Sequence, residues 1–173
     1  MTRLPTALAA AALCGCTAYV TTTKEDTFGG KFQTPIGWNI ESGPGKSAIL
    51  KQPNGAGTVV LHEFPQGASC DTALRETRQS LNGVRPWKQN GDRATVVVAG
   101  INDGPVLGAA LCEIAAGGTF VVSVAAPKSV WLDGKEDLYK IAESYRRNDK
   151  LVFNAAPLRR VNPDGTIVKP KDD

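Results

Sequence analysis

Three runs of apolar and β-branched residues in the second half of the chain constrain the fold more than any other feature. They span residues 94–101, 106–115 and 119–125. The junctions contain Asp103-Gly104 and Gly117-Gly118, dipeptides that favour the tight turns of β-hairpins. We therefore expect three neighbouring antiparallel strands. The nearly continuous apolar pattern indicates that at least one face of their sheet is covered.

Two helices are predicted, one before these runs and one after them. The first is expected to begin at Ser69, whose hydroxyl suits an N-cap position. The second carries an apolar stripe at helical spacing, formed by Leu138, Ile141, Ala142 and Tyr145. Asp133 and Glu136 resemble a capping box at its start, and Arg146-Arg147 are expected in its last turn.

Two more strands are predicted in the first half, at residues 47–51 and 58–64. They flank Pro53-Asn54-Gly55, which is typical of a hairpin turn. The order of strands, helix, three strands and helix predicts an α+β fold in which two helices pack on an antiparallel sheet. The length of 173 residues fits one such domain.

Two short motifs, together with the order of the expected strands and helices, resemble those of a known domain family. Residues 32–38, with the sequence FQTPIGW, are similar to the F-x-x-P-x-G-W opening of PsbP/Mog1-like domains. Residues 141–145, IAESY, resemble the I-x-x-S-F motif in the last helix of that family. The resemblance implies a sheet with one helix on each side. It also implies an accessory or partner-binding module without a catalytic site or cofactor.

The N-terminus resembles the export signal of bacterial lipoproteins. Arg3 precedes an apolar stretch at residues 4–13, which is shorter than the ~20 apolar residues of a transmembrane helix. Leu13, Gly15 and Cys16 then match the lipobox, with an aliphatic residue three positions before the cysteine and a small residue directly before it. The resemblance implies cleavage before Cys16, acylation of its thiol and, often, of the new amine.

The residue before each cysteine decides which of two neighbours carries the lipid. Cys14 would place Leu13 at the cleavage position, where a small residue is required, whereas Cys16 places Gly15 there. Thr17, and not an aspartate, follows Cys16, which favours the outer membrane facing the periplasm over the inner membrane in Gram-negative bacteria. The alternative is an ordinary signal peptide, cut near Gly15, that leaves a soluble secreted protein.

These signals divide the chain into four expected parts. They are a signal peptide at 1–15, a polar tether at 16–27, the α+β domain at 28–150 and a C-terminal tail at 151–173.

Cys70 and Cys112 are the two cysteines that fall in the expected domain. An exported protein meets oxidising conditions, so we expect them to form a disulfide. The alternative is two separate buried thiols. Neither cysteine has the further Cys or His ligands nearby that a metal site requires, so no metal is expected.

His62 is the single histidine of the chain. Its neighbour Glu63 is expected to point to the opposite face of the same strand, so the two do not form a local dyad. The sequence also has no G-x-S-x-G motif of a hydrolase nucleophile. We therefore interpret His62 as a half-exposed polar residue and predict no catalytic site.

Trp38, Trp87 and Trp131 are candidates for a partner-binding surface, since exposed aromatic side chains anchor many protein interfaces. The alternative for each is packing in the core. The formal net charge is only +3, with cations scattered among acids, which gives no indication of nucleic-acid binding.

The sequence thus predicts a non-enzymatic binding or accessory module, held on the cell envelope by a lipid and bound to a protein partner there. Two alternatives remain: an immunity or inhibitor protein against a specific toxin or enzyme, and a small envelope hydrolase. The first requires a concentrated exposed patch, and the second requires a pocket that joins His62 to a serine or aspartate.

Overall fold

The structure is a computed structural model that describes residues 19–23, 30–43, 45–80, 84–86, 96–115, 117–162 and 168. One antiparallel sheet has the order β3-β4-β5-β9-β8-β7-β6. Its strands are β3 (Asn39–Gly43), β4 (Ser47–Lys51), β5 (Thr58–Phe64), β6 (Val84–Pro86), β7 (Val96–Asp103), β8 (Val106–Ala115) and β9 (Gly118–Pro127). A smaller sheet contains β1 (Tyr19–Thr23), β2 (Gly30–Pro35), β10 (Arg146–Arg147) and β11 (Lys150–Leu151). The helices are α2 (Cys70–Ser80), α3 (Lys128–Ser144) and the 3-10 helix η1 (Leu158–Arg160).

The three predicted neighbouring strands are confirmed as β7, β8 and β9. Asp103 pairs with Val106 across the first hairpin, and Ala115 pairs with Gly118 across the second. Gly104 and Gly117 adopt positive φ angles of 57° and 102° in these turns, a conformation that glycine reaches without steric cost. The predicted strands at 47–51 and 58–64 are β4 and β5, so the α+β fold expected from the sequence is confirmed.

The start of α2 is also as predicted. The Thr72 amide donates to the Ser69 hydroxyl at 3.2 Å, and the Ala73 amide donates to the Ser69 carbonyl at 3.0 Å. Ser69 therefore caps a helix whose own first four amides have no partner within the helix.

Both predicted boundaries of the second helix were wrong. α3 begins at Lys128, five residues before Asp133, because Trp131 packs in the core and the Lys128 amide donates to the Pro105 carbonyl at 2.8 Å. It ends at Ser144, because Tyr145 is extended and buried. Arg146-Arg147 lie outside the helix and pair with β2.

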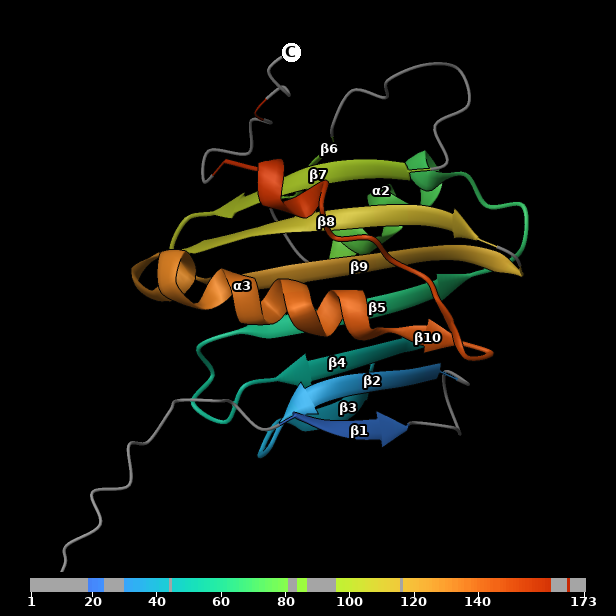
Figure 1. Cartoon of the computed structure of the whole chain (residues 1–173). Coiled ribbons are helices and arrows are strands. Elements are labelled where there is room, and N and C mark those ends of the chain that lie inside the picture. Colours follow the sequence, from blue (N-terminus) through green and yellow to red (C-terminus); the bar gives the residue numbers. More distant parts are fainter. Residues whose placement is uncertain are drawn as a thin grey trace, which may run out of the picture.

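The two helices cover opposite faces of the larger sheet, with α3 in front and α2 behind in Figure 1. Alternate residues of β8 and β9 divide between the two sides. Leu111 and Val122 belong to the core cluster that includes α3, whereas Cys112 and Val121 belong to the cluster that includes α2. Each helix therefore has its own core.

The segment after α3 completes the core on the α3 side. It crosses the sheet above α3 (Figure 1), and η1 contacts β8. Its buried side chains are Val152, Phe153, Ala155, Leu158 and Val161. Much of the segment that the sequence assigns to a tail is thus packed in the domain. Similarly, residues 19–23 of the expected tether form β1, which pairs with β2 along its whole length.

Candidate functional site

A cleft of about 540 Å³ opens at the end of β5, beside α2. Gly45 and Lys46 of the β3–β4 turn form one side, and Glu76 of α2 forms another. The strand itself contributes a run of four residues to the wall: His62, Glu63, Phe64 and Pro65. The cleft therefore lies where α2 leaves part of its face of the sheet uncovered.

His62 and Phe64 form the aromatic part of the cleft. They lie on the same face of β5, and their rings are stacked with centroids 5.9 Å apart and an angle of 16° between the planes. Burial lowers the pKa of His62, because the charged imidazolium loses solvation. The imidazole is therefore neutral at neutral pH and offers one hydrogen-bond donor and one acceptor.

Glu63 reaches the other side of the sheet, as predicted. His62 pairs with Val121, which lies in the α2 core, whereas Glu63 pairs with Phe120, which lies in the α3 core. The Glu63 carboxylate lies 3.3 Å from the Arg147 guanidinium and 3.9 Å from the Lys46 amine, with only 9% of its side chain exposed. These ion pairs tie the strand end to the β3–β4 turn and to β10.

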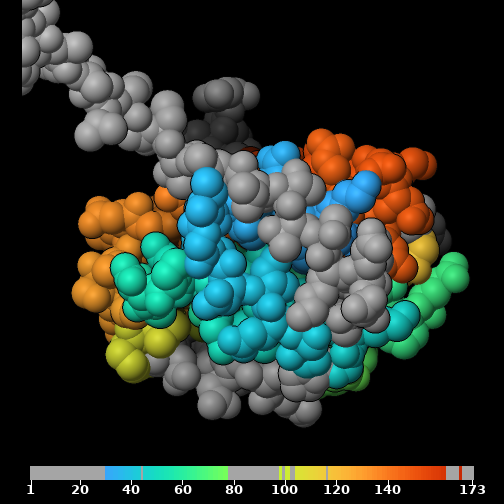
Figure 2. Space-filling model, turned by 90° about the horizontal axis from the view of Figure 1, so that it is seen from below, coloured from blue at the N-terminus to red at the C-terminus, as the bar shows by residue number. Residues whose placement is uncertain are grey.

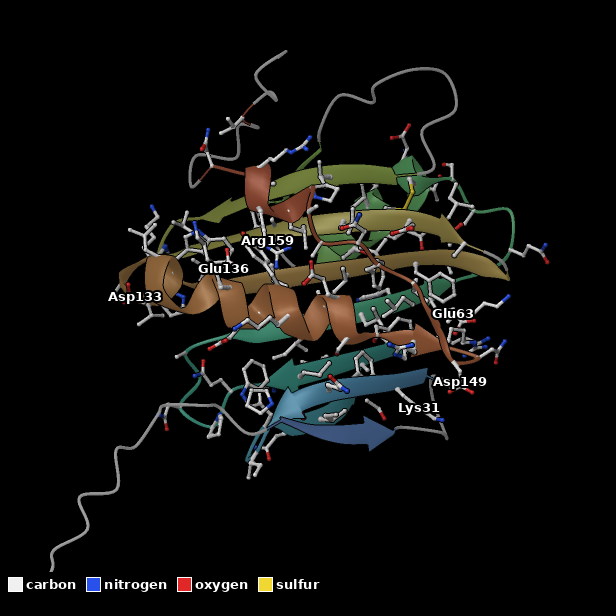
Figure 3. The ribbon with its side chains drawn as sticks, viewed as in Figure 1. Lys31, Glu63, Asp133, Glu136, Asp149 and Arg159 are labelled. Carbon is white, nitrogen blue, oxygen red and sulfur yellow. A yellow bond between two sulfur atoms is a disulfide. The ribbon has the colours of Figure 1, made fainter. Side chains whose placement is uncertain are left out.

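Figure 3 shows the charged residues on the α3 side of the sheet, with Glu63 and the Lys31–Asp149 pair at one end and Asp133 at the other. Glu136 and Arg159 lie between these ends, and their side chains join α3 to η1 at 3.2 Å. Arg159 also binds Glu143, which holds the pKa of that carboxyl below its usual range. These groups fasten the C-terminal segment.

Ser47 is the serine that lies directly across from His62 in the register of β4 and β5. Its side chain is fully buried and lies beside Gly43, where an added Cβ would collide with the serine oxygen. It is therefore shielded from the cleft. Glu76 and Lys46 line the same cleft as His62, and no serine is among its lining residues.

The Cys70–Cys112 disulfide is confirmed. It joins the first residue of α2 to β8 with 5.6 Å between the two Cα atoms, and both residues are buried. Because the bond fixes the start of α2 on the sheet, it also fixes the helix that carries Glu76 to the cleft. The sequence alone did not show whether α2 packs close enough to β8 for Cys70 and Cys112 to meet.

The three tryptophans have different outcomes. Trp131 is 1% exposed and meets Tyr139 edge-on at 6.2 Å, so its indole is part of the core and presents no binding surface. Trp38 is half-buried and packs against the same core. Trp87 lies outside the described residues, as does Cys16.

Phe64 and Glu76 were not singled out from the sequence. Alternation along β5 places Phe64 beside His62, so this pair was accessible to sequence reasoning. Glu76 could not be identified from the sequence, because its place in the cleft depends on where α2 packs on the sheet.

The described part of the chain contains no helix long and apolar enough to span a bilayer, and no cluster of three metal-ligating side chains.

The fold is similar to that of known structures. The solution structure of cyanobacterial PsbP (CyanoP) from Synechocystis sp. PCC 6803 matches with a TM-score of 0.51 and 12% sequence identity, over 81% of this chain and 98% of that one. This likeness shows a PsbP-like fold and nothing further. A Bacteroides thetaiotaomicron VPI-5482 protein matches with a TM-score of 0.38 and 16% identity, over 77% of this chain and 53% of that one, which is too low to support an argument. No family model and no curated protein matches the sequence.

Proposed function

We propose that this chain is an envelope lipoprotein, held on a membrane by the acylated Cys16, whose domain binds a protein partner without catalysing a reaction. The observation that carries the binding half is the cleft at the end of β5, which combines the stacked His62 and Phe64 with the charged rim residues Lys46 and Glu76. An aromatic floor with charged edges is typical of the centre and rim of a protein interface. The PsbP-like fold is in accord with an accessory role.

The anchor rests on the sequence. The apolar stretch at 4–13, with Gly15 directly before Cys16, matches a lipobox, and Thr17 favours the periplasmic side of an outer membrane. Burial of acyl CH₂ groups contributes about 0.8 kcal/mol each, so two or three chains make release from the bilayer very slow.

The arrangement of polar groups supports binding over hydrolysis. Glu63 is engaged with Arg147 and Lys46, and Ser47 is shielded from the cleft. A hydrolase requires a nucleophile within hydrogen-bond reach of its base. His62→Gln keeps a polar side chain of similar size, so we expect it to retain the cellular phenotype of the wild type. Loss of that phenotype in a folded His62→Gln protein that captures the same envelope partner as the wild type would favour the hydrolase alternative.

The charges near the cleft also bear on the inhibitor alternative. Lys31 pairs with Asp149 at 3.2 Å, and Arg147 pairs with Glu63, so neighbouring cations are offset by carboxylates. A toxin inhibitor was expected to show a concentrated exposed patch, and this mixed surface favours an accessory partner instead.

The binding half is tested by charge reversal at the rim. Lipidated protein carrying Lys46→Glu and Glu76→Lys is used to capture partners from detergent-solubilised envelope, beside the wild type and a Lys140→Glu control at an exposed position of α3. We expect the control to retain a captured protein that the rim variant loses, with both variants folded. Equal capture by all three proteins would contradict binding at this cleft.

A further inference from the structure

The first described strand begins close to the proposed anchor. Tyr19, the first residue of β1, pairs with Pro35, the last residue of β2. Cys16 precedes Tyr19 by three residues, which span about 10 Å at most when fully extended. If Cys16 is acylated as proposed above, the end of the domain that contains Pro35 is held within this distance of the lipid.

This end carries an exposed apolar side chain beside the anchored strand. Ile36 follows Pro35 in the β2–β3 turn and is 67% exposed. The next residue, Gly37, has a φ of 90° and lies against Pro53, whose Cγ would be 3.5 Å from an added Cβ. The β2–β3 turn is therefore in contact with the β4–β5 turn.

The β4–β5 turn in turn lies beside α3. Gly57 lies against Leu138, and a cavity of about 230 Å³ is walled by Gln52 and Ala56 on one side and Val130 on the other. Figure 2 shows the orange start of α3 beside the blue-green β4–β5 turn at one edge of the molecule. Leu132, in the first turns of α3, is 68% exposed at this edge.

Charge differs between the two ends of the domain. At the anchored end, Lys51 is paired with Glu41 at 2.7 Å, and the first turns of α3 carry the exposed Lys128 and Asp133 and the half-buried Lys135. At the other end lie the described cations Lys31, Lys46, Arg146, Arg147 and Lys150, with Glu63 and Asp149. Among the described residues, the anchored end therefore presents fewer ions to be desolvated.

We propose that the end formed by the β2–β3 turn, the β4–β5 turn and the start of α3 rests on the bilayer that holds the Cys16 lipid, with Ile36 and Leu132 in the interfacial region. The short tether makes this contact effectively intramolecular, so two apolar side chains suffice where they would not recruit a free protein. β4 runs from the cleft end at Ser47 to the anchored end at Lys51, so the cleft faces away from the membrane.

Thiol-specific labelling tests this orientation. Ile36→Cys and Leu132→Cys proteins are compared with Ile114→Cys and Leu151→Cys proteins. Ile114 and Leu151 are apolar residues away from the anchored end and are 43% and 57% exposed. Cys70 and Cys112 are bridged, and an acylated Cys16 does not react, so an environment-sensitive NBD dye marks only the introduced site.

Each lipidated, labelled protein is reconstituted into vesicles of phosphatidylethanolamine and phosphatidylglycerol and separated by flotation. We expect NBD at 36 and 132 to shift to shorter wavelength and to be quenched several-fold more by nitroxide lipids than NBD at 114 and 151. Floating protein with the same aqueous spectrum at all four sites overturns the orientation and leaves the anchor intact. Protein that does not float overturns the anchor and the orientation together.

Discussion

The two faces of the seven-stranded sheet are covered in different ways. On the α3 face, β2, α3 and residues 152–161 enclose a large core in which Tyr145 lies 4.9 Å from Phe32 and 5.9 Å from Phe153, measured between ring centroids. On the α2 face, one helix covers a smaller core fixed by a disulfide, and a cleft remains beside it. Because its core is larger, we expect the first face to supply most of the stability, whereas the second carries the cleft.

Removal of the C-terminal segment is expected to have the largest effect, because it uncovers the α3 face and leaves the α2 face unchanged. A chain that ends at Lys150 loses the buried side chains of Val152, Phe153 and Leu158 from the α3 face. Each such loss costs about 2–5 kcal/mol, and together they are comparable to the 5–15 kcal/mol that ordinarily stabilises a domain. We expect no cooperative unfolding transition by circular dichroism. A chain that ends at Asn162 is the control, and a folded 150-residue form would contradict the assignment.

Tyr145→Ala tests the aromatic centre of the α3 face. The side chain is fully buried among Phe32, Phe120 and Phe153, so its truncation leaves a large cavity. We expect a loss of about 3–5 kcal/mol in the free energy of unfolding, measured in urea. Leu132→Ala, at a 68% exposed position, is the control and should change stability by less than about 0.5 kcal/mol. Equal effects would remove the distinction between core and surface.

The disulfide provides the matching test on the α2 face. Cys70 and Cys112 are 42 residues apart, and closing a loop of this length contributes about 4 kcal/mol on the chain-entropy model. We expect the Cys70→Ala, Cys112→Ala protein to stay folded with a lower Tm and with faster amide exchange in α2 than in α3. Reductant should destabilise the wild type and leave the double variant unchanged. Uniformly faster exchange on both faces would show that the two cores are not separate.

The smallest expected effect concerns His62 in the cleft. Its folded pKa is lowered, so the unfolded chain binds the proton more readily. The stability contributed by the neutral imidazole is present above the unfolded pKa of about 6.5 and is lost as the pH falls from there to the folded pKa. We expect the Tm to fall less between pH 7.5 and pH 5 in His62→Gln than in the wild type. Identical pH profiles would mean that His62 is as solvated in the folded chain as in the unfolded one.

The sequence predicted what local chemistry decides. The hairpin dipeptides at Asp103-Gly104 and Gly117-Gly118 set the turns of β7, β8 and β9, and Ser69 set the start of α2. The start of α3 was not predicted from the sequence, because burial of Trp131 extends the helix to residues before the cap-like Asp133.

The candidate site was less accessible to sequence reasoning. The opposite directions of His62 and Glu63 follow from strand alternation and were predicted. The cleft also requires Lys46 and Glu76, which come from a turn and a helix that meet only through tertiary packing. The packing of residues 152–161 was missed for the same reason: their apolar residues lack the regular spacing of a helix or strand.

The proposed attachment of this domain to a membrane through Cys16 is tested by metabolic labelling with palmitate. Wild-type, Cys14→Ala and Cys16→Ala chains are expressed in a Gram-negative host and immunoprecipitated after labelling. We expect label in the first two proteins and none in Cys16→Ala. An unlabelled wild type, or label that persists in Cys16→Ala, would contradict it.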